Sequence, residues 1–283
     1  MNKLALGTVQ FGMNYGINNK GGSPSDENIS NILNFAFKNG IQTLDTAVAY
    51  GNSQKRLGEI SKNDFQIISK FSGVYNFRDL EGELLKSLSL LKINMIYGFM
   101  FHNADELIEN PKMWNFLEKL KASYKIKKIG FSIYNEKQLN TILELGFIPD
   151  IVQLPYSILD RRLENSLIKL KMNKVEVHVR SVFLQGLYFK DVNNLSKDLQ
   201  PLRSNLKKIH EICKTNNIKM STLALNFVKQ NKNIDKIVIG ADSTEQIIEN
   251  IESMNYNLSQ DIIKLVYKIN VVEKKLLNPV NWN

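Results

Sequence analysis

Four polar residues early in the chain can together protonate a carbonyl oxygen: Asp45, Tyr50, Lys70 and His102. A free tyrosine titrates near a pKa of about 10, and a neighbouring lysine ammonium, itself anchored by Asp45, is expected to lower that value. His102 would donate a hydrogen bond to the substrate oxygen and orient it toward Tyr50, whose proton is delivered as negative charge develops. None of these groups can supply a hydride. We therefore expect a redox cofactor, for which a nicotinamide is the natural candidate.

Each of these residues lies at or just beyond the end of a segment with the pattern of a buried strand. Asp45 and Tyr50 belong to TLDTAVAYG, with Gly51 marking the turn, while Lys70 closes ISK and His102 closes GFMFH. In parallel α/β folds the C-terminal ends of the strands carry the chemistry. A lysine that follows an apolar run is costly to bury without an anion, so Asp45 on the adjacent strand is its expected partner.

Each residue taken singly also has a structural explanation. Asp45 and Lys70 would form an ion pair that only stabilises the fold, Tyr50 would be an aromatic residue at the rim, and His102 a hydrogen-bonded core histidine. Their joint occurrence at consecutive strand ends favours the catalytic interpretation.

The elements that must position these residues alternate between strands and helices. Strands are predicted at residues 4–9, 43–46, 66–70, 95–101, 128–132, 151–154, 175–179 and 236–239. Apolar residues recur at helical spacing in 29–38, 77–91, 113–123, 136–145, 164–171, 202–216, 223–230 and 244–252. Eight strands alternating with helices predict an α/β fold, a (β/α)8 TIM barrel. A doubly wound sheet fits less well, because GTVQFG has the wrong spacing for a dinucleotide motif and no helix directly after it.

The composition indicates a single domain covering residues 1–283. The chain is 43% hydrophobic and 23% charged, and it has no Pro/Gly/Ser-rich linker and no low-complexity run. It starts with a strand almost at once and has no signal-peptide pattern and no apolar run long enough to cross a bilayer, so we expect a cytoplasmic protein without a membrane partner. The net charge of +9 comes from lysines interleaved with acidic residues, which argues against a nucleic-acid partner but leaves a basic surface that helps anionic ligands approach.

Other reactive side chains are expected to be structural. Cys213 is the single cysteine, and nothing nearby in the sequence would lower the pKa of its thiol. His178 lies within a predicted strand and His210 on a helix face, without acidic or thiol residues at ligand spacing, so no metal site is expected. Tyr156 is expected either to touch substrate or to anchor its loop, and Trp282 either to pack or to reach the pocket mouth.

Several segments follow one another in a characteristic order: LGTVQFG, LDTAVAYGNSQKRLGE, ISKF, FMFHNADEL, GFSIYN, VQLPYSILDRR and VIGADSTEQIIENI. Together they resemble the aldo-keto reductases from end to end. The resemblance implies a barrel that binds NADPH in an extended form without a Rossmann domain and reduces aldehydes or ketones to alcohols. Asp45, Tyr50, Lys70 and His102 match the catalytic tetrad of that family.

The resemblance also implies residues that hold the cofactor. Ser132 and Gln153 match positions at the nicotinamide carboxamide, although the asparagine usual after that serine is Ile133 here. Arg180 replaces an aromatic residue that often stacks on the nicotinamide, and its planar guanidinium could stack there and add positive charge beside the substrate. The remaining matches are Gly7 and Thr8 in LGTVQFG, Ser181, Phe183 and Gln185 at the pyrophosphate, and Gly240, Ala241, Ser243, Gln246 and Asn250 at the adenosine and 2′-phosphate.

Among the residues expected around the adenosine, some favour NADPH and others favour NADH. Ser243 and Gln246 have the spacing of a capping box, and the helix N-terminus that they predict favours an anion such as a second phosphate. Gln246, however, stands where many relatives have arginine, and Asp242 adds a nearby negative charge. NADPH is favoured, with NADH as the alternative.

Two other classes of function stay open. Some family members serve chiefly as redox-sensing partners of other proteins, so a cofactor-binding regulatory subunit with little turnover is the first. A metal-dependent lyase or hydrolase using Asp45 and His102 is the second, and it lacks further ligands at strand ends. If the chain is a reductase, Arg180 and the short loops indicate a small polar or sugar-like carbonyl substrate. The oligomeric state cannot be read from the sequence.

Overall fold

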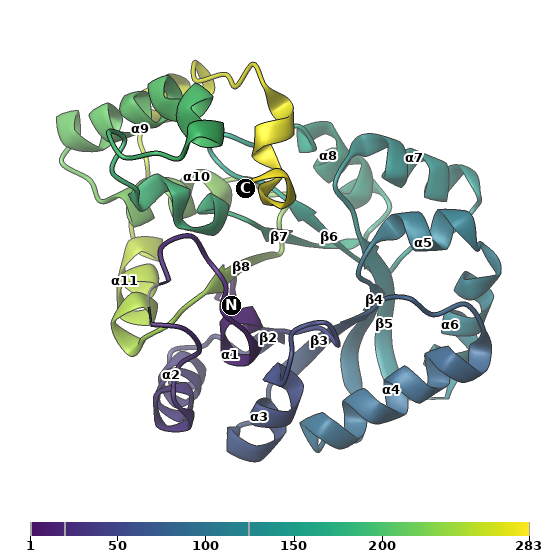
Figure 1. The fold of residues 1–283 in the computed structure, drawn as a ribbon. Helices are drawn as coiled ribbons and strands as arrows, with labels where there is room; N and C mark the ends of the chain where they lie inside the picture. The colour runs from purple at the N-terminus through teal and green to yellow at the C-terminus, as the bar shows by residue number, and fades with distance from the viewer. Residues whose placement is uncertain (1, 20, 124, 283) are drawn as a thin grey trace.

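Eight parallel strands close into a barrel in the computed structural model, which describes residues 2–19, 21–123 and 125–282 (Figure 1). The strands are β1 (Leu4–Gly7), β2 (Thr43–Asp45), β3 (Gln66–Phe71), β4 (Ile96–Phe101), β5 (Ile126–Ser132), β6 (Ile151–Pro155), β7 (Glu176–Arg180) and β8 (Lys236–Gly240). Each strand pairs with the next along the chain, and β8 pairs with β1. The TIM barrel predicted from the sequence is confirmed. The ends of the expected domain, residues 1 and 283, lie outside the described residues.

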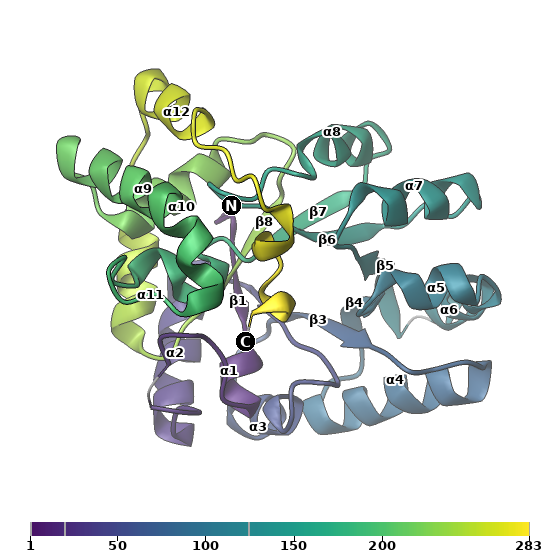
Figure 2. The same ribbon diagram turned by 45° about the horizontal axis from the view of Figure 1, so that its top comes forward.

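Helices surround the barrel, as Figure 1 and Figure 2 show from two directions. They are α1 (Val9–Gly12), α2 (Asp26–Lys38), α3 (Ser53–Ile60), α4 (Phe77–Leu91), α5 (Ala104–Glu109), α6 (Lys112–Ala122), α7 (Glu136–Glu144), α8 (Glu164–Met172), α9 (Arg203–Thr215), α10 (Met220–Lys229), α11 (Thr244–Met254) and α12 (Gln260–Tyr267). Short 3-10 segments follow β7 at Leu184–Phe189, precede α9 at Lys197–Leu202, and lie near the C-terminus at Lys274–Leu277 and Pro279–Asn281.

The helix α4 illustrates why these segments are helical. The Asn76 side chain caps the first turn by accepting a hydrogen bond of 3.0 Å from the Asp79 backbone N–H. Leu80, Leu84 and Leu88 recur every fourth residue and are buried, so one face packs on the sheet. The helix ends at Lys92, which takes the left-handed conformation with φ 56°.

The first strand is shorter than the sequence predicts. It ends at Gly7 because the backbone N–H and the hydroxyl of Thr8 both bind the carbonyl oxygen of Asp45, at 2.9 and 3.0 Å. The one-turn helix α1 follows at once, whereas no helix was expected directly at this segment. The short α1 places Gly12 against the loop that carries Tyr50.

Three helices carry no clear signal in the sequence. The buried face of α3 consists of Ser53, Gln54 and Leu57, so two of its three buried positions are polar and the apolar period is missing. The helix α5 has only six residues, and α12 buries only Ile262 and Val266.

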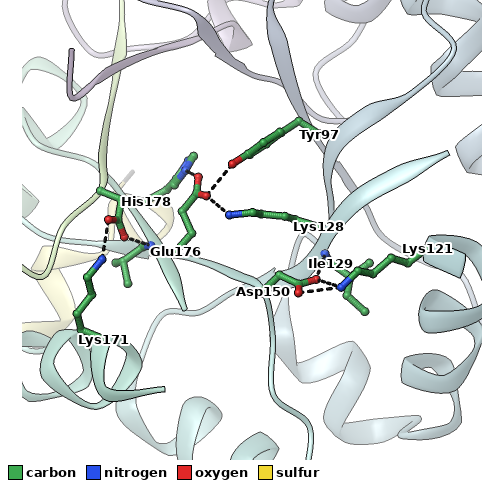
Figure 3. A network of polar contacts seen from close by, with 10 residues as sticks. Tyr97, Lys121, Lys128, Ile129, Asp150, Lys171, Glu176 and His178 are labelled. Carbon is green, nitrogen blue, oxygen red and sulfur yellow. Dashed lines mark hydrogen bonds and ion pairs between the residues drawn. The ribbon is translucent and has the colours of Figure 1, made fainter. Parts of the chain in front are cut away.

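Two aspartates at the N-terminal end of the barrel, Asp150 and Asp235, each extend the pairing of two neighbouring strands (Figure 3). Asp150 precedes β6; its N–H donates to the Ile129 carbonyl and its Oδ2 accepts from the Ile129 N–H, both at 2.9 Å. Asp235 precedes β8 and makes the same exchange with Val177, at 2.9 and 2.8 Å. A lysine binds each carboxylate, Lys121 on Asp150 and Lys171 on Asp235. Each carboxylate therefore adds one hydrogen-bonded rung below the regular register of its strand pair.

Glu176 gathers a second polar group at the same end of the barrel. Its carboxylate accepts from Tyr97 Oη at 2.8 Å and contacts Lys128 Nζ and His178 Nε2 (Figure 3). Burial opposes ionisation, but the His178 and Lys128 contacts dominate and hold the pKa of Glu176 at about 2. These contacts lie at the N-terminal ends of the strands, where residues in barrel folds serve stability.

A small apolar layer separates this polar end from the opposite one. Ile68, Met100 and Ile151 form a buried cluster apart from the main core between sheet and helices. A Cβ on Gly98 would lie 2.6 Å from Ile68 Cδ1 and 3.8 Å from Ile151 Cδ1, which shows that side chains of β3 and β6 meet inside the barrel in front of β4. Above this layer, toward the C-terminal ends of the strands, the interior is polar again.

Candidate active site

A cavity of about 620 Å³ opens at the C-terminal ends of the strands and runs toward the start of α11. Fourteen of the residues expected at a site line it: Gly7, Thr8, Asp45, Tyr50, His102, Ser132, Gln153, Arg180, Ser181, Phe183, Gln185, Gly240, Gln246 and Asn250. Lys70, Ala241 and Ser243 are not part of this lining. The barrel thus brings together residues separated by up to most of the chain length, as the strand-end rule predicts.

The ion pair between Asp45 and Lys70 forms the floor of the cavity. Lys70 Nζ lies 2.7 Å from Asp45 Oδ1 and also donates to the Thr46 carbonyl oxygen at 3.2 Å. The Lys70 side chain is 1% exposed, so it acts on the cavity only through its neighbours. Burial lowers the pKa of Lys70, and the Asp45 carboxylate opposes that fall. The partner that an apolar surrounding demands for this lysine is therefore present.

The second oxygen of Asp45 is held from across the barrel. Gln153 Nε2, from β6, donates to Asp45 Oδ2 at 2.7 Å. Gln153 is buried and lies beside Ser132 in the register of β5 and β6. Asp45 is thus fixed through both oxygens, by a cation on the neighbouring strand and by an amide on the opposite side.

Tyr50 is placed in the cavity by a close approach of two backbones. A Cβ on Gly12 would lie only 1.8 Å from the Tyr50 carbonyl oxygen. Only a glycine at this position of α1 therefore allows the two backbones to pack so closely. The Ser53 N–H binds that same oxygen at 3.0 Å at the start of α3. No hydrogen bond joins the Tyr50 hydroxyl to another residue in the described part of the chain, and Tyr50 lines the cavity.

The sequence predicts that Lys70 lowers the pKa of Tyr50, but in the structure this pKa is raised. Burial raises the pKa of Tyr50, and the negative charge of Asp45 raises it further. Lys70 Nζ lies 5.4 Å from the centre of the tyrosine ring, but its charge is already balanced by Asp45. The Tyr50 hydroxyl is therefore protonated at neutral pH and is not poised to ionise.

His102 faces Tyr50 as a neutral ring. The two rings are edge to face with centroids 5.7 Å apart, and the His102 backbone N–H is fixed on the Phe71 carbonyl at 2.8 Å. Burial, and then the positive charge of Lys70, lower the pKa of His102 to about 4. A neutral imidazole offers one N–H donor and one acceptor nitrogen, so His102 can donate a hydrogen bond without carrying charge.

The segment after β7 takes a strained path along the cavity. Ser181, Leu184 and Gln185 all have positive φ, at 61°, 45° and 54°. The loop after α1 lies against it: Gln185 Nε2 donates to Tyr15 Oη at 3.0 Å, and Asn18 Nδ2 donates to the Gly186 carbonyl at 2.6 Å. Tyr15, Asn18 and Asn19 line the cavity and were not predicted, because an aperiodic loop gives no signal of where it folds back.

The far end of the cavity is the N-terminus of α11. Ser243 caps this helix by accepting from the Gln246 N–H at 3.4 Å, but Gln246 Oε1 accepts from the Asp242 N–H at 2.9 Å. The predicted capping box is thus only half formed, because the glutamine reaches one residue too far back. Asp242 lies in the lining, its Oδ1 has no partner among the residues described, and burial raises the pKa of its carboxyl.

The residues along the cavity fit an extended nicotinamide dinucleotide. Ser132 and Gln153 supply polar groups at one end, and the α11 N-terminus offers backbone N–H groups to an anion at the other. Between them, a Cβ on Gly240 would lie 2.5 Å from Gln10 Nε2, and Gln10 Oε1 is buried without a partner in the part of the chain that is described. An unsatisfied buried oxygen beside a backbone free of side chain is consistent with a ligand-binding groove.

Arg180 ends β7 at the same side of the cavity as Tyr50 and His102. Its guanidinium Cζ lies 4.4 Å from the centre of the Tyr134 ring, and Nη2 lies 3.4 Å from the Ile133 carbonyl oxygen. The guanidinium therefore has one face on an aromatic ring, and stacking on a nicotinamide stays a prediction.

The remaining candidates lie outside the cavity lining. His178 contacts Glu176, and His210 Nε2 lies 2.8 Å from the Tyr188 carbonyl oxygen. Tyr156 donates to Glu164 at 2.8 Å, which agrees with loop anchoring, and Trp282 donates to the Leu276 carbonyl at 2.8 Å. Burial raises the pKa of the Cys213 thiol to about 11. Across the described ranges no three His, Cys, Asp or Glu side chains come together as metal ligands. None of the helices described is long and apolar enough to span a membrane.

This fold and site define a class, the barrel oxidoreductases that act on carbonyl groups with a nicotinamide cofactor. The chain belongs to the aldo/keto reductase family: the profile described as Aldo/keto reductase family matches residues 3–271. Family members are NAD(P)H-dependent oxidoreductases.

Individual relatives are distant but match most of the chain. The NADH-specific methylglyoxal reductase of Escherichia coli (strain K12) is 27% identical, over 92% of this chain and 95% of its own length. The L-glyceraldehyde 3-phosphate reductase of Escherichia coli O157:H7 is 25% identical, over 79% of this chain and 78% of its own length. The glycerol dehydrogenase AKR11B4 of Gluconobacter oxydans has a TM-score of 0.78 at 18% identity, covering 100% of this chain and 95% of its own. The holo form of the aldo-keto reductase AKR11C1 of Bacillus halodurans has a TM-score of 0.77 at 20% identity, covering 94% and 91%.

Proposed function

We propose that the protein is a carbonyl reductase that converts an aldehyde or ketone to an alcohol with a nicotinamide cofactor, and that Tyr50 is the proton donor. The observation that carries this proposal is the pairing of the free Tyr50 hydroxyl with the neutral His102 ring at one cavity wall, 5.7 Å between centroids. Two uncharged donors beside one another suit an oxygen that becomes negative only during the reaction.

The proposed mechanism assigns one task to each residue of the tetrad. The bound cofactor supplies the hydride. His102, neutral because burial lowers its pKa, donates a hydrogen bond to the carbonyl oxygen and holds it toward Tyr50. Tyr50 keeps its proton at rest, since burial and Asp45 raise its pKa, and releases it to the more basic alkoxide. Lys70 balances the Asp45 carboxylate, whose unpaired charge would otherwise raise that pKa further.

For the cofactor, we assign its nicotinamide carboxamide to Ser132 and Gln153 and its pyrophosphate to the segment with Ser181, Phe183 and Gln185. The assignment of Gln153 is consistent with an amide whose nitrogen already binds Asp45 and whose oxygen is left for the ligand. The Arg180 guanidinium would stack near the nicotinamide. The adenosine would occupy the groove formed by Gly7, Thr8, Gly240, Ala241, Ser243, Gln246 and Asn250.

We favour NADPH, with NADH as the alternative. The α11 N-terminus supports a 2′-phosphate, whereas Asp242 beside it disfavours one. Fluorescence titration with both cofactors separates the two cases, because a 2′-phosphate site gives a lower Kd for NADPH.

We further propose a small polar or sugar-like carbonyl substrate and a cytoplasmic location. The compounds named for two relatives, methylglyoxal and L-glyceraldehyde 3-phosphate, are both small carbonyl compounds. Reduction of bulky apolar ketones, with no turnover of hydroxyaldehydes or keto-sugars, would contradict this substrate class.

The decisive experiment replaces Tyr50 by Phe. We expect the Tyr50→Phe variant to bind cofactor with the Kd of the parent and to lose turnover by about 100-fold or more, as for removal of a general acid. Full turnover in this variant would refute the role of Tyr50. Tight cofactor binding by the parent without turnover of any carbonyl compound would instead support the regulatory-subunit alternative.

A further inference from the structure

Arg180 is a half-buried arginine of the cavity lining whose guanidinium makes few contacts with the protein. Within the described ranges no carboxylate oxygen lies within 4.0 Å of its guanidinium, and its one hydrogen bond, to the Ile133 carbonyl, is long at 3.4 Å. The ring of Tyr134 covers one face without neutralising the charge. At least one edge of the planar fork is left for another acceptor.

Three other arginines, Arg56, Arg161 and Arg162, each make at least two side-chain hydrogen bonds within the protein. Arg56 binds Asp26, Ser23 and two backbone carbonyls, and Arg162 binds both oxygens of Asp160 at 2.8 and 2.7 Å. Arg161 donates to the carbonyls of Ile158 and Ile269. Against this pattern, a purely structural role explains Arg180 poorly.

The surroundings of Arg180 make that part of the cavity positive. Asp45 is the acidic residue of the lining at this end, and Lys70 already balances it. The other acidic residues of the lining, Asp242 and Glu249, belong to the α11 end, where Glu249 accepts a bond from Ser221 at 2.6 Å. The charge of Arg180 reaches the reacting groups: it opposes the burial that raises the pKa of Tyr50 and adds to the burial that lowers the pKa of His102.

We propose that Arg180 selects substrates that carry an anionic group, a carboxylate or a phosphate, on a short chain next to the carbonyl. The inference rests on the carbonyl reductase function proposed above and narrows its substrate class. A planar guanidinium binds either anion through two parallel N–H bonds, which would fix the carbonyl end toward Tyr50 and His102. Hydride and proton add across the C=O bond and the cofactor is oxidised. The anionic group does not react and stays on the product.

Two matched pairs of aldehydes test this selection. The first is 4-oxobutanoate with butanal, which share a four-carbon chain and differ in a terminal carboxylate. The second is glyceraldehyde 3-phosphate with glyceraldehyde. For the parent we expect a higher kcat/KM for the charged member of at least one pair, and the pair that shows it identifies the anion as carboxylate or phosphate.

The variant Arg180→Gln keeps a planar polar group and removes the charge. We expect the ratio of kcat/KM for the preferred charged aldehyde to kcat/KM for its neutral partner to fall about ten- to a hundred-fold, mostly through the KM of the charged aldehyde. Arg180→Lys should fall in between, because it keeps the charge and loses the fork. Arg78→Gln, on the exposed first turn of α4, removes the same charge outside the cavity and should match the parent.

Three results would overturn the proposal. One is an equal fall for charged and neutral aldehydes, accompanied by a raised Kd for the cofactor, which would assign Arg180 to the nicotinamide alone. Another is a parent that prefers the neutral member of both pairs. The third is a parent that reduces no aldehyde with either cofactor, which would reject the proposed function itself.

Discussion

Gln153 Nε2 donates a 2.7 Å hydrogen bond to Asp45 Oδ2, joining β6 to β2 across the interior of the barrel. Because Lys70 holds the other oxygen at the same distance, the carboxylate cannot turn without breaking one of two buried contacts. The position of Lys70 beneath the Tyr50 ring therefore depends on a residue from the opposite side of the barrel, one that the sequence links only to the cofactor.

The first prediction concerns this amide. Replacing Gln153 by Leu removes one donor from a buried carboxylate, and we expect the free energy of unfolding to fall by about 1.5–3 kcal/mol, the range for hydrogen bonds to charged groups. Gln54→Leu is the matched control, because Gln54 is equally buried but donates to the neutral hydroxyl of Ser69 at 2.8 Å. Urea denaturation of both variants measures the difference. An equal loss at the two positions would show that the charge of Asp45 adds nothing.

The second prediction concerns pH and His102. Its pKa is about 4 in the folded protein and about 6.5 in an unfolded chain, so below pH 6.5 the unfolded state binds a proton that the folded state does not. The contribution of His102 to stability is therefore complete above pH 6.5 and is lost as the pH falls toward 4, by at most about 3 kcal/mol. Urea denaturation between pH 8 and pH 4.5 should give a shallower decline for His102→Gln than for the parent. Parallel curves for the two proteins would contradict the buried neutral ring.

The barrel and the clustering of Asp45, Tyr50, Lys70 and His102 could be predicted because both depend on local patterns. Short apolar runs bounded by Gly, and polar residues at their ends, are visible residue by residue along the chain, and the strand-end rule converts them into a site. The bond between Asp45 and Gln153 could not be predicted, since the distance between two residues 108 positions apart is fixed only when the barrel closes. The loop with Tyr15 and Asn18 lacks any period for the same reason: its place depends on the segment after β7.

The direction of the pKa shift of Tyr50 could not be predicted from the sequence, for a different reason. The sequence correctly brings a lysine near the tyrosine, but the sign of the pKa shift depends on how deeply each group is buried and on which charge is already paired. Likewise, the spacing of Ser243 and Gln246 is right for a capping box, and only the path of the backbone decides that Gln246 reaches Asp242 instead.

The third prediction concerns the aspartate rungs at the N-terminal end of the barrel. Asp150→Ala leaves the Ile129 N–H without its acceptor, so we expect a loss of about 1–3 kcal/mol, whereas Asp150→Asn keeps an oxygen there and should lose less than about 1 kcal/mol. Lys121→Met should also cost little, because the Lys121 and Asp150 side chains are 37% and 32% exposed. Urea denaturation measures these losses.

The same series at Asp235 and Lys171 repeats the test on a second copy of the arrangement. Because both rungs lie at the end of the barrel opposite the cavity, kcat for any carbonyl substrate should stay unchanged in all of these variants. A loss as large for Lys121→Met as for Asp150→Ala would show that the ion pair, and not the extended rung, stabilises this end.

The last prediction concerns the choice between the two cofactors. Asp242 borders the cavity beside the first turn of α11, and its negative charge opposes a 2′-phosphate in that place. Asp242→Asn should therefore lower the Kd for NADPH relative to the Kd for NADH by about two- to five-fold, the range for one charge at a helix N-terminus. Glu245→Gln, which removes an acidic residue of the same turn that does not line the cavity, is the control and should leave the ratio of the two Kd values close to that of the parent. Fluorescence titration gives both constants, and an equal change for NADPH and NADH in Asp242→Asn would place the second phosphate away from this carboxylate.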